Sequence, residues 1–94
     1  MNRVLVAVPG AEVVVPWESR DALLEELRRR DDAGEAIAAF EAVGATRPVE
    51  LDVYSQVVVV ETIRDMERRA EVRLPDGLRD LLTALVDELH HHSG

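Results

Sequence analysis

The chain has 94 residues, of which 47% are hydrophobic and 32% charged, and its formal net charge is −8. This length predicts one small domain, and this balance excludes an intrinsically disordered chain. The sequence contains no cysteine, which excludes a disulfide framework and a thiolate metal site. Because nucleic-acid binding depends on neutralising phosphates, the acidic balance predicts no nucleic-acid partner. No apolar run approaches the roughly 20 residues of a membrane span, so we expect a cytoplasmic protein with no membrane partner.

Two short runs rich in β-branched residues open the chain. Residues 3–8 read RVLVAV and residues 11–15 read AEVVV. Pro9 and Gly10 lie between them, and this dipeptide is typical of a turn. We therefore predict an N-terminal β-hairpin, which Pro16 ends because proline cannot donate to a strand ladder.

Two short helices are predicted to follow the hairpin. The first has Ser19 as its N-cap and ends near Arg30. The second begins at Asp31 or Asp32, either of which can cap it, and runs to about residue 43, with Gly44 as a left-handed stop. The expected buried residues are Leu23, Leu24 and Leu27 in the first helix and Ala36, Ile37, Phe40 and Val43 in the second.

Residues 45–51, ATRPVEL, are compatible with two conformations. Pro48 discourages a helical Arg47, and apolar and acidic residues alternate after it, which favours a short extended segment and a possible third strand near 47–51. In the alternative, the next helix begins at Pro48, a residue that is well tolerated in a first helical turn.

The longest apolar segment lies near residues 52–70 and is expected to form the central helix, with Asp52 as its cap. Four consecutive valines at 57–60 fill more than one helical turn, so we expect apolar side chains on every side of this turn. Val53, Val57 and Val60 would line one face and Val59, Ile63, Met66 and Ala70 another. A long strand over 49–60 is the alternative, because valine prefers strands.

The cleanest amphipathic pattern lies in the last part of the chain. Asp76 is expected to cap a helix that runs to about His90. Its apolar positions are Leu78, Leu81, Leu82, Leu85, Val86 and Leu89. The predicted fold is therefore α+β: the hairpin, a possible third strand and about four helices form one compact domain over residues 1–90, and 91–94 form a frayed tail.

No group of residues predicts catalysis or a cofactor. His90, His91 and His92 are consecutive and would point in different directions, so a frayed tail or the remnant of a purification tag is a better explanation than a metal site. The arginine clusters at 28–30 and at 68, 69 and 73 are flanked by carboxylates and indicate solvated helix faces. The histidines are confined to the tail, which leaves no base for a serine nucleophile. We therefore expect a protein that is not an enzyme and needs no metal or cofactor.

The remaining hypotheses concern binding. The first is a small interaction module that associates with itself as a homodimer, through the last helix or the edge of the hairpin. The second is an acidic inhibitor or antitoxin-like partner of a basic protein. The third is a small-ligand pocket near Trp17, Arg20 and Arg47, with Tyr54 as a further group to consider. The candidate interface residues are Trp17, Arg20, Arg47, Leu78, Leu82, Leu85 and Leu89. The segment EAVGATRPVEL over residues 41–51 reads like part of a bacterial protein.

Overall fold

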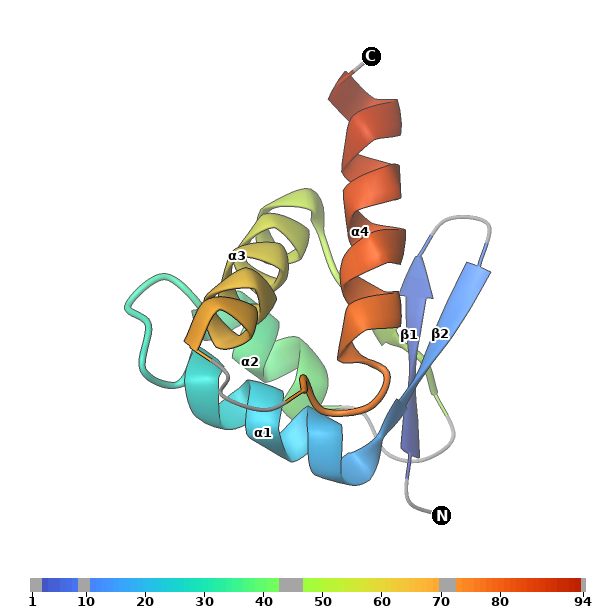
Figure 1. Ribbon diagram of the computed structural model, residues 1–94. Helices are drawn as coiled ribbons and strands as arrows, with labels where there is room; N and C mark the ends of the chain where they lie inside the picture. Colours follow the sequence, from blue (N-terminus) through green and yellow to red (C-terminus); the bar gives the residue numbers. More distant parts are fainter. Residues whose placement is uncertain (1–2, 9–10, 43–46, 70–72, 94) are drawn as a thin grey trace.

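The computed structural model describes residues 3–8, 11–42, 47–69 and 73–93, without the side chains of Ala11 and of residues 91–93. Within these residues the chain forms a three-stranded sheet and four helices. Figure 1 shows all the helices on one side of the sheet. The predicted α+β class is confirmed, with the N-terminal hairpin packed against the helices.

The sheet has the order β2-β1-β3. Strand β1 (Arg3–Val8) and strand β2 (Ala11–Pro16) are antiparallel, with Arg3 opposite Pro16 and Val8 opposite Ala11. Strand β3 (Val49–Glu50) runs parallel to β1 on its other side. The extended reading of residues 47–51 is therefore correct, and the helix starting at Pro48 is wrong. The expected turn at residues 9–10 lies outside the described residues.

Side chains alternate between the two faces of β1. Val4, Val6 and Val8 are buried beneath the helices, whereas the residues between them are only partly covered. This period of two is what a strand produces when only one face of its sheet packs on the core. The sheet therefore has an inner face under the helices and an outer face that no described element covers (Figure 1).

Helix α1 (Trp17–Leu27) begins directly after the last strand residue. Pro16 is its N-cap, with φ −56° and ψ 148°, and no side chain donates or accepts a capping hydrogen bond there. The prediction that Ser19 caps this helix is wrong, because the helix starts three residues earlier than such a cap implies and Ser19 lies buried in its first turn. The chain passes from strand to helix without a loop, so no separate capping residue intervenes.

Helix α2 (Gly34–Glu41) is shorter than predicted. Its N-cap is Ala33, without a side-chain cap, so the prediction of an Asp31 or Asp32 cap is wrong. The Asp32 carboxylate instead accepts two hydrogen bonds from Arg30, at 2.9 and 3.1 Å. Ala36 and Phe40 are buried as expected and Ile37 is half-buried. The expected residues Val43 and Gly44 lie outside the described part of the chain.

Helix α3 (Val53–Arg69) lies at the centre of the helical layer and contacts each of the other three helices. The Asp52 cap is confirmed, because the Ser55 backbone N–H donates to Asp52 Oδ1 at 2.7 Å. The segment is thus a helix and not the alternative strand. The valines are not buried on every side, however: positions 58–60 are buried, whereas Val57 is 37% exposed and Val53 51% exposed.

Helix α4 (Leu78–Ser93) runs antiparallel to α3 and lies between α3 and the sheet (Figure 1). It begins two residues after the predicted cap, and the Gly77 carbonyl accepts its first backbone bond, from Leu81 at 3.0 Å. Asp76 therefore lies before the cap position and does not cap the helix as predicted. The helix also extends beyond the expected end near His90. No helix in the described part of the chain is long and apolar enough to cross a membrane.

Candidate functional site

Trp17 and Arg20, two of the predicted interface residues, contact each other. The Arg20 guanidinium carbon lies 4.2 Å from the centroid of the Trp17 ring, in a cation–π arrangement. Arg20 also pairs with Asp21 at 2.8 Å and donates to the Phe40 carbonyl at 3.3 Å. Its side chain is only 12% exposed. Arg20 thus joins α1 to the end of α2, which is a structural role.

Arg47 and Tyr54 occupy different places. Arg47 is exposed and lines a shallow hollow between α2 and β3, with Pro48 and Glu50. Tyr54 is 55% exposed in the first turn of α3. Trp17 and Arg20 do not line the Arg47 hollow. The structure therefore brings together one pair of the four residues that were considered for a ligand pocket.

The leucines of the last helix divide into two groups. Leu78 and Leu85 are fully buried in the core, together with Leu81. Leu82 and Leu89 are half-buried and pack against the edge of that core. Most of the leucine stripe is therefore occupied within the chain, and only Leu82 and Leu89 retain surface for a partner.

The free edge of β2 is partly covered by the turn that precedes α4. A Cβ atom on Gly77 would lie 2.9 Å from both the Val14 carbonyl oxygen and the Pro16 Cδ atom. Gly77 therefore packs against this edge at Val14 and Pro16, and Pro16 has no backbone N–H to offer a further strand. Little of this edge remains for a further strand, and the Glu12 side chain adds a charge beside it, which discourages edge pairing.

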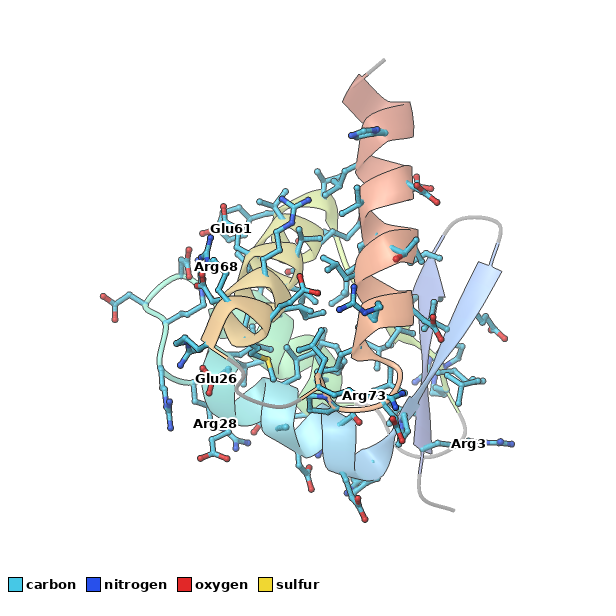
Figure 2. The ribbon with its side chains drawn as sticks, in the orientation of Figure 1. Arg3, Glu26, Arg28, Glu61, Arg68 and Arg73 are labelled. Atoms are coloured by element: carbon cyan, nitrogen blue, oxygen red, sulfur yellow. The ribbon has the colours of Figure 1, made fainter. Side chains whose placement is uncertain are left out.

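The outer face of the sheet carries an ordered pattern that the sequence reading did not identify. Leu5 lies opposite Val14 in the middle of this face, and Val14 is 46% exposed. Arg3 lies at one end and points away from the helices (Figure 2). At the other end, Ala7 is flanked by Glu12 on β2 and Glu50 on β3. The alternation of valine with other residues over positions 3–8 was the sequence signal for this face.

Three large apolar side chains are exposed together at the start of α3. Val53, Tyr54 and Val57 are 51%, 55% and 37% exposed. Val14 is the only other large hydrophobic residue among the described positions with comparable exposure. Isolated exposed apolar residues are ordinary, but a cluster of them marks a candidate interaction surface. Sequence reasoning missed this cluster because it assigned the valines to the core.

Two carboxyl groups meet beside this cluster. The pKa of Asp52 is lowered from its ordinary value, chiefly because its carboxylate accepts the hydrogen bond from the Ser55 backbone N–H. The pKa of Glu35 is raised, because its carboxyl hydrogen-bonds to Asp52 and lies in the field of that negative charge. Both groups are exposed, so this end of the molecule presents negative charge to solvent.

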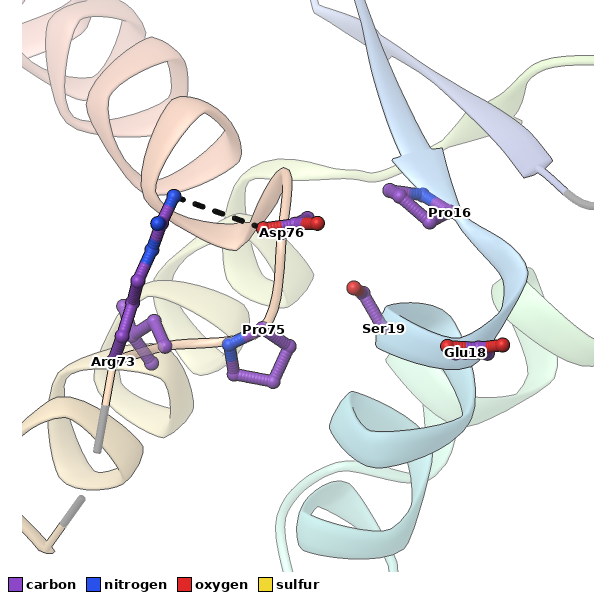
Figure 3. Close-up of a pocket in the computed structure, with 7 residues that line it drawn as sticks. Pro16, Glu18, Ser19, Arg73, Pro75 and Asp76 are labelled. Carbon is purple, nitrogen blue, oxygen red and sulfur yellow. Dashed lines mark ion pairs between the residues drawn. The ribbon is translucent and has the colours of Figure 1, made fainter. Parts of the chain in front are cut away.

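A hollow of about 480 Å³ lies where the start of α1 faces the segment before α4 (Figure 3). Ser19 points into it. Glu18 and Asp76 lie on its walls, and Arg73 pairs with Asp76 at 3.8 Å. The two carboxylates oppose an anion, while the amides at the start of α1 oppose a cation. The hollow therefore favours neither kind of charged ligand.

The arginine clusters are engaged in ion pairs on the side of the helices away from the sheet (Figure 2). Arg30 pairs with Asp32, Glu61 and Asp65 at 2.9, 2.9 and 3.6 Å. Arg69 reaches Glu26 at 2.5 Å, which links α3 to α1. Of the flanking carboxylates expected to neutralise these clusters, Asp32 pairs with Arg30, whereas Glu67 pairs with Arg79 and Glu71 lies outside the described residues.

No set of three or more potential metal ligands gathers anywhere in the described residues. His90 is exposed on α4, and the side chains of the next two histidines lie outside the description. No protein-family model matches the sequence, and the searches of curated proteins and of solved structures gave no match either. The function is therefore argued from the surfaces of the molecule.

Proposed function

We propose that this chain is a small, non-enzymatic protein-interaction module that forms a homodimer through the outer face of its sheet. The observation that carries the proposal is the order of side chains on that face. An apolar centre, Leu5 and Val14, lies between a basic end at Arg3 and an acidic end at Glu12 and Glu50. Such a face is complementary to itself.

The charges select one arrangement of two copies. A two-fold axis that lies between the sheets and perpendicular to their strands places apolar centre on apolar centre. It also places Arg3 of each copy against the acidic end of the other, where both Glu12 and Glu50 lie. An axis parallel to the strands would instead bring Arg3 against Arg3 and is disfavoured by like-charge repulsion.

The size of the face sets the expected strength. β1 and β2 have six residues each and β3 has two, so two stacked sheets bury less surface than a standard stable interface. We therefore expect a reversible dimer with a dissociation constant on the order of micromolar or weaker.

The test is the molar mass in solution, measured by light scattering coupled to size exclusion over a wide concentration range. We expect the wild-type mass to rise towards that of a dimer, and Val14→Asp to abolish the rise. Val57→Asp is the matched control, since Val57 is similarly exposed on α3, and it should leave the dimer intact. A wild-type chain that stays monomeric throughout overturns the proposal.

Charge reversal tests the arrangement of the two copies. Arg3→Glu alone should weaken the dimer, and so should Glu12→Arg together with Glu50→Arg. The triple variant that carries all three changes should recover it, because each new cation again faces a new anion. If neither Arg3→Glu nor the pair Glu12→Arg and Glu50→Arg weakens the dimer, the copies meet in another orientation.

A further inference from the structure

The end of the α3–α4 pair offers a second surface that is independent of the sheet. Val53, Tyr54 and Val57 occupy one side of the first turns of α3, at 51%, 55% and 37% exposure. Val86 and Leu89 on α4 are half-buried. We call these five residues the helical end patch.

An ion pair fixes how the two helices align. Arg79 near the start of α4 pairs with Glu67 near the end of α3 at 2.5 Å. Because the two helices are antiparallel, the last turns of α4 lie at the same end of the pair as the first turns of α3 (Figure 1). Val86 follows Arg79 by two turns and so lies on the side of α4 that faces α3.

The last turns of α4 project past the sheet and the other helices (Figure 1). No described residue covers Val53, Tyr54 or Val57 to the extent that the core residues are covered. Exposed apolar residues on one helix, beside a second helix that projects past it, form the kind of surface on which a third amphipathic helix packs.

The charges around the helical end patch are mainly negative. Asp52 directly precedes Val53, and the Glu35 carboxyl lies against Asp52. Asp87 is exposed on α4 directly after Val86. The C-terminal end of α4 adds the partial negative charge of the helix dipole. One arginine, Arg64, follows two turns after Val57, and His90 follows Leu89.

We propose that the helical end patch binds a basic amphipathic helix of a different protein. Its apolar stripe would cover Val53, Val57 and Leu89, and its arginines or lysines would face the carboxylates at the rim. A second copy of this chain is a poor occupant, because two acidic ends and two helix C-termini would then meet. This inference does not depend on the proposed dimer, which uses the opposite part of the molecule.

The binding experiment uses two synthetic peptides of about 15 residues, long enough for four helical turns. Both carry leucine at the spacing i, i+3, i+4 and i+7; one has arginine at the remaining positions and the other glutamate. Fluorescence anisotropy of a labelled peptide reports binding to the full chain. We expect the basic peptide to bind, more weakly at high salt, and the acidic peptide not to bind.

Substitutions locate the bound peptide. The double variant V53Q/V57Q should weaken binding about tenfold, because two partly exposed valines would no longer be covered. Glutamine has at least the helix propensity of valine, so α3 should persist, which circular dichroism checks. Val14→Gln on the sheet is the matched apolar control and should leave the affinity unchanged.

Charge is tested in the same way. Glu35→Gln should weaken binding about twofold and reduce its dependence on salt, whereas Glu12→Gln on the outer sheet face should do neither. Absence of binding to the basic peptide overturns the inference. Equal binding of the basic and the acidic peptide also overturns it. The same holds if Val14→Gln and V53Q/V57Q lose the same amount of affinity for the basic peptide. A self-association that V53Q/V57Q removes would identify a second copy as the occupant and would likewise overturn it.

Discussion

Gly77 lies so close to the carbonyl of Val14 that a side chain between them is excluded. A Cβ atom on Gly77 would be 2.9 Å from the Val14 oxygen, a separation that real Cβ atoms essentially never show. Gly77 also has φ 83°, in the left-handed region that glycine adopts without strain. This contact places the start of α4 against the edge of the sheet and thereby helps to orient the longest amphipathic helix.

Gly77→Ala is therefore expected to lower the free energy of unfolding by about 2–4 kcal/mol, from backbone strain and the close contact together. Gly34→Ala is the matched control, because nothing lies within 4 Å of its added methyl group. Alanine favours helix α2, so this control should be stabilised by about 0.5 kcal/mol. Urea denaturation measures both. Equal effects of the two substitutions would contradict the packing seen at Gly77.

Arg30→Gln is expected to cost about 1 kcal/mol of stability, because Arg30 pairs with three carboxylates and its side chain is 23% exposed. The loss should shrink at high salt, which screens these pairs. Arg64→Gln is the control, since Arg64 is exposed and forms no ion pair with another described residue. Thermal unfolding at low and high salt distinguishes the two. A salt-independent loss would show that Arg30 acts through packing.

Asp52 predicts a pH dependence of stability. Its pKa in the folded chain is lowered, so its ionised form stabilises the fold above the unfolded value of about 3.9, and this contribution is lost as the pH falls through the folded pKa. Asp52→Asn keeps a capping oxygen but has no charge. The melting temperatures of wild type and Asp52→Asn should therefore differ at neutral pH and converge in acid. A constant difference would exclude the charge as its cause.

Glu35 should act in the opposite sense. Its raised pKa means that the protonated form is favoured by folding, so its contribution is present below the unfolded value of about 4.3 and is lost as the pH rises through the folded pKa. Glu35→Gln removes the repulsion from Asp52 and should raise the melting temperature at neutral pH but not in acid. An unchanged melting temperature at neutral pH would contradict the interaction between the two carboxyls.

Leu85 and Leu89 share one stripe of α4 but differ in burial. Leu85→Ala should cost about 2–5 kcal/mol, because Leu85 is fully buried and the substitution leaves a cavity. Leu89→Ala should cost less than half as much, since Leu89 is only partly buried at the rim of the core. Urea denaturation of both variants measures the difference. Equal losses would mean that α4 packs with a different face towards the core.

Much of the secondary structure followed from local patterns. The alternation around Val4 and Val6 requires a strand with one buried face, and Pro48 disfavours a helical conformation of Arg47 before it. The leucine spacing in the last part of the chain requires an amphipathic helix. Asp52 has a side-chain oxygen that can accept a backbone hydrogen bond from the first turn of a helix, and it caps α3. These elements depend on residues within a few positions of one another, so they can be read without the tertiary structure.

The errors at helix starts have a common physical cause. Ser19 and Asp32 can each cap a helix, but Ser19 is buried in a helix that begins directly after a strand, and Asp32 binds Arg30 instead. Asp76 lies before the start of α4, and the packing of Gly77 against β2 determines where that helix starts. A capping residue is a local preference, and a contact from a distant segment can displace it.

The sequence by itself determined the class of fold and most of its elements. Only the tertiary structure decided which apolar side chains remain at the surface. Val57 and Val58 are identical residues one position apart, and docking of α4 and the other helices against α3 buries one and leaves the other partly exposed. Periodicity indicates that an apolar face exists, but burial depends on what packs against it. The candidate interaction surfaces therefore emerge only when the elements are assembled.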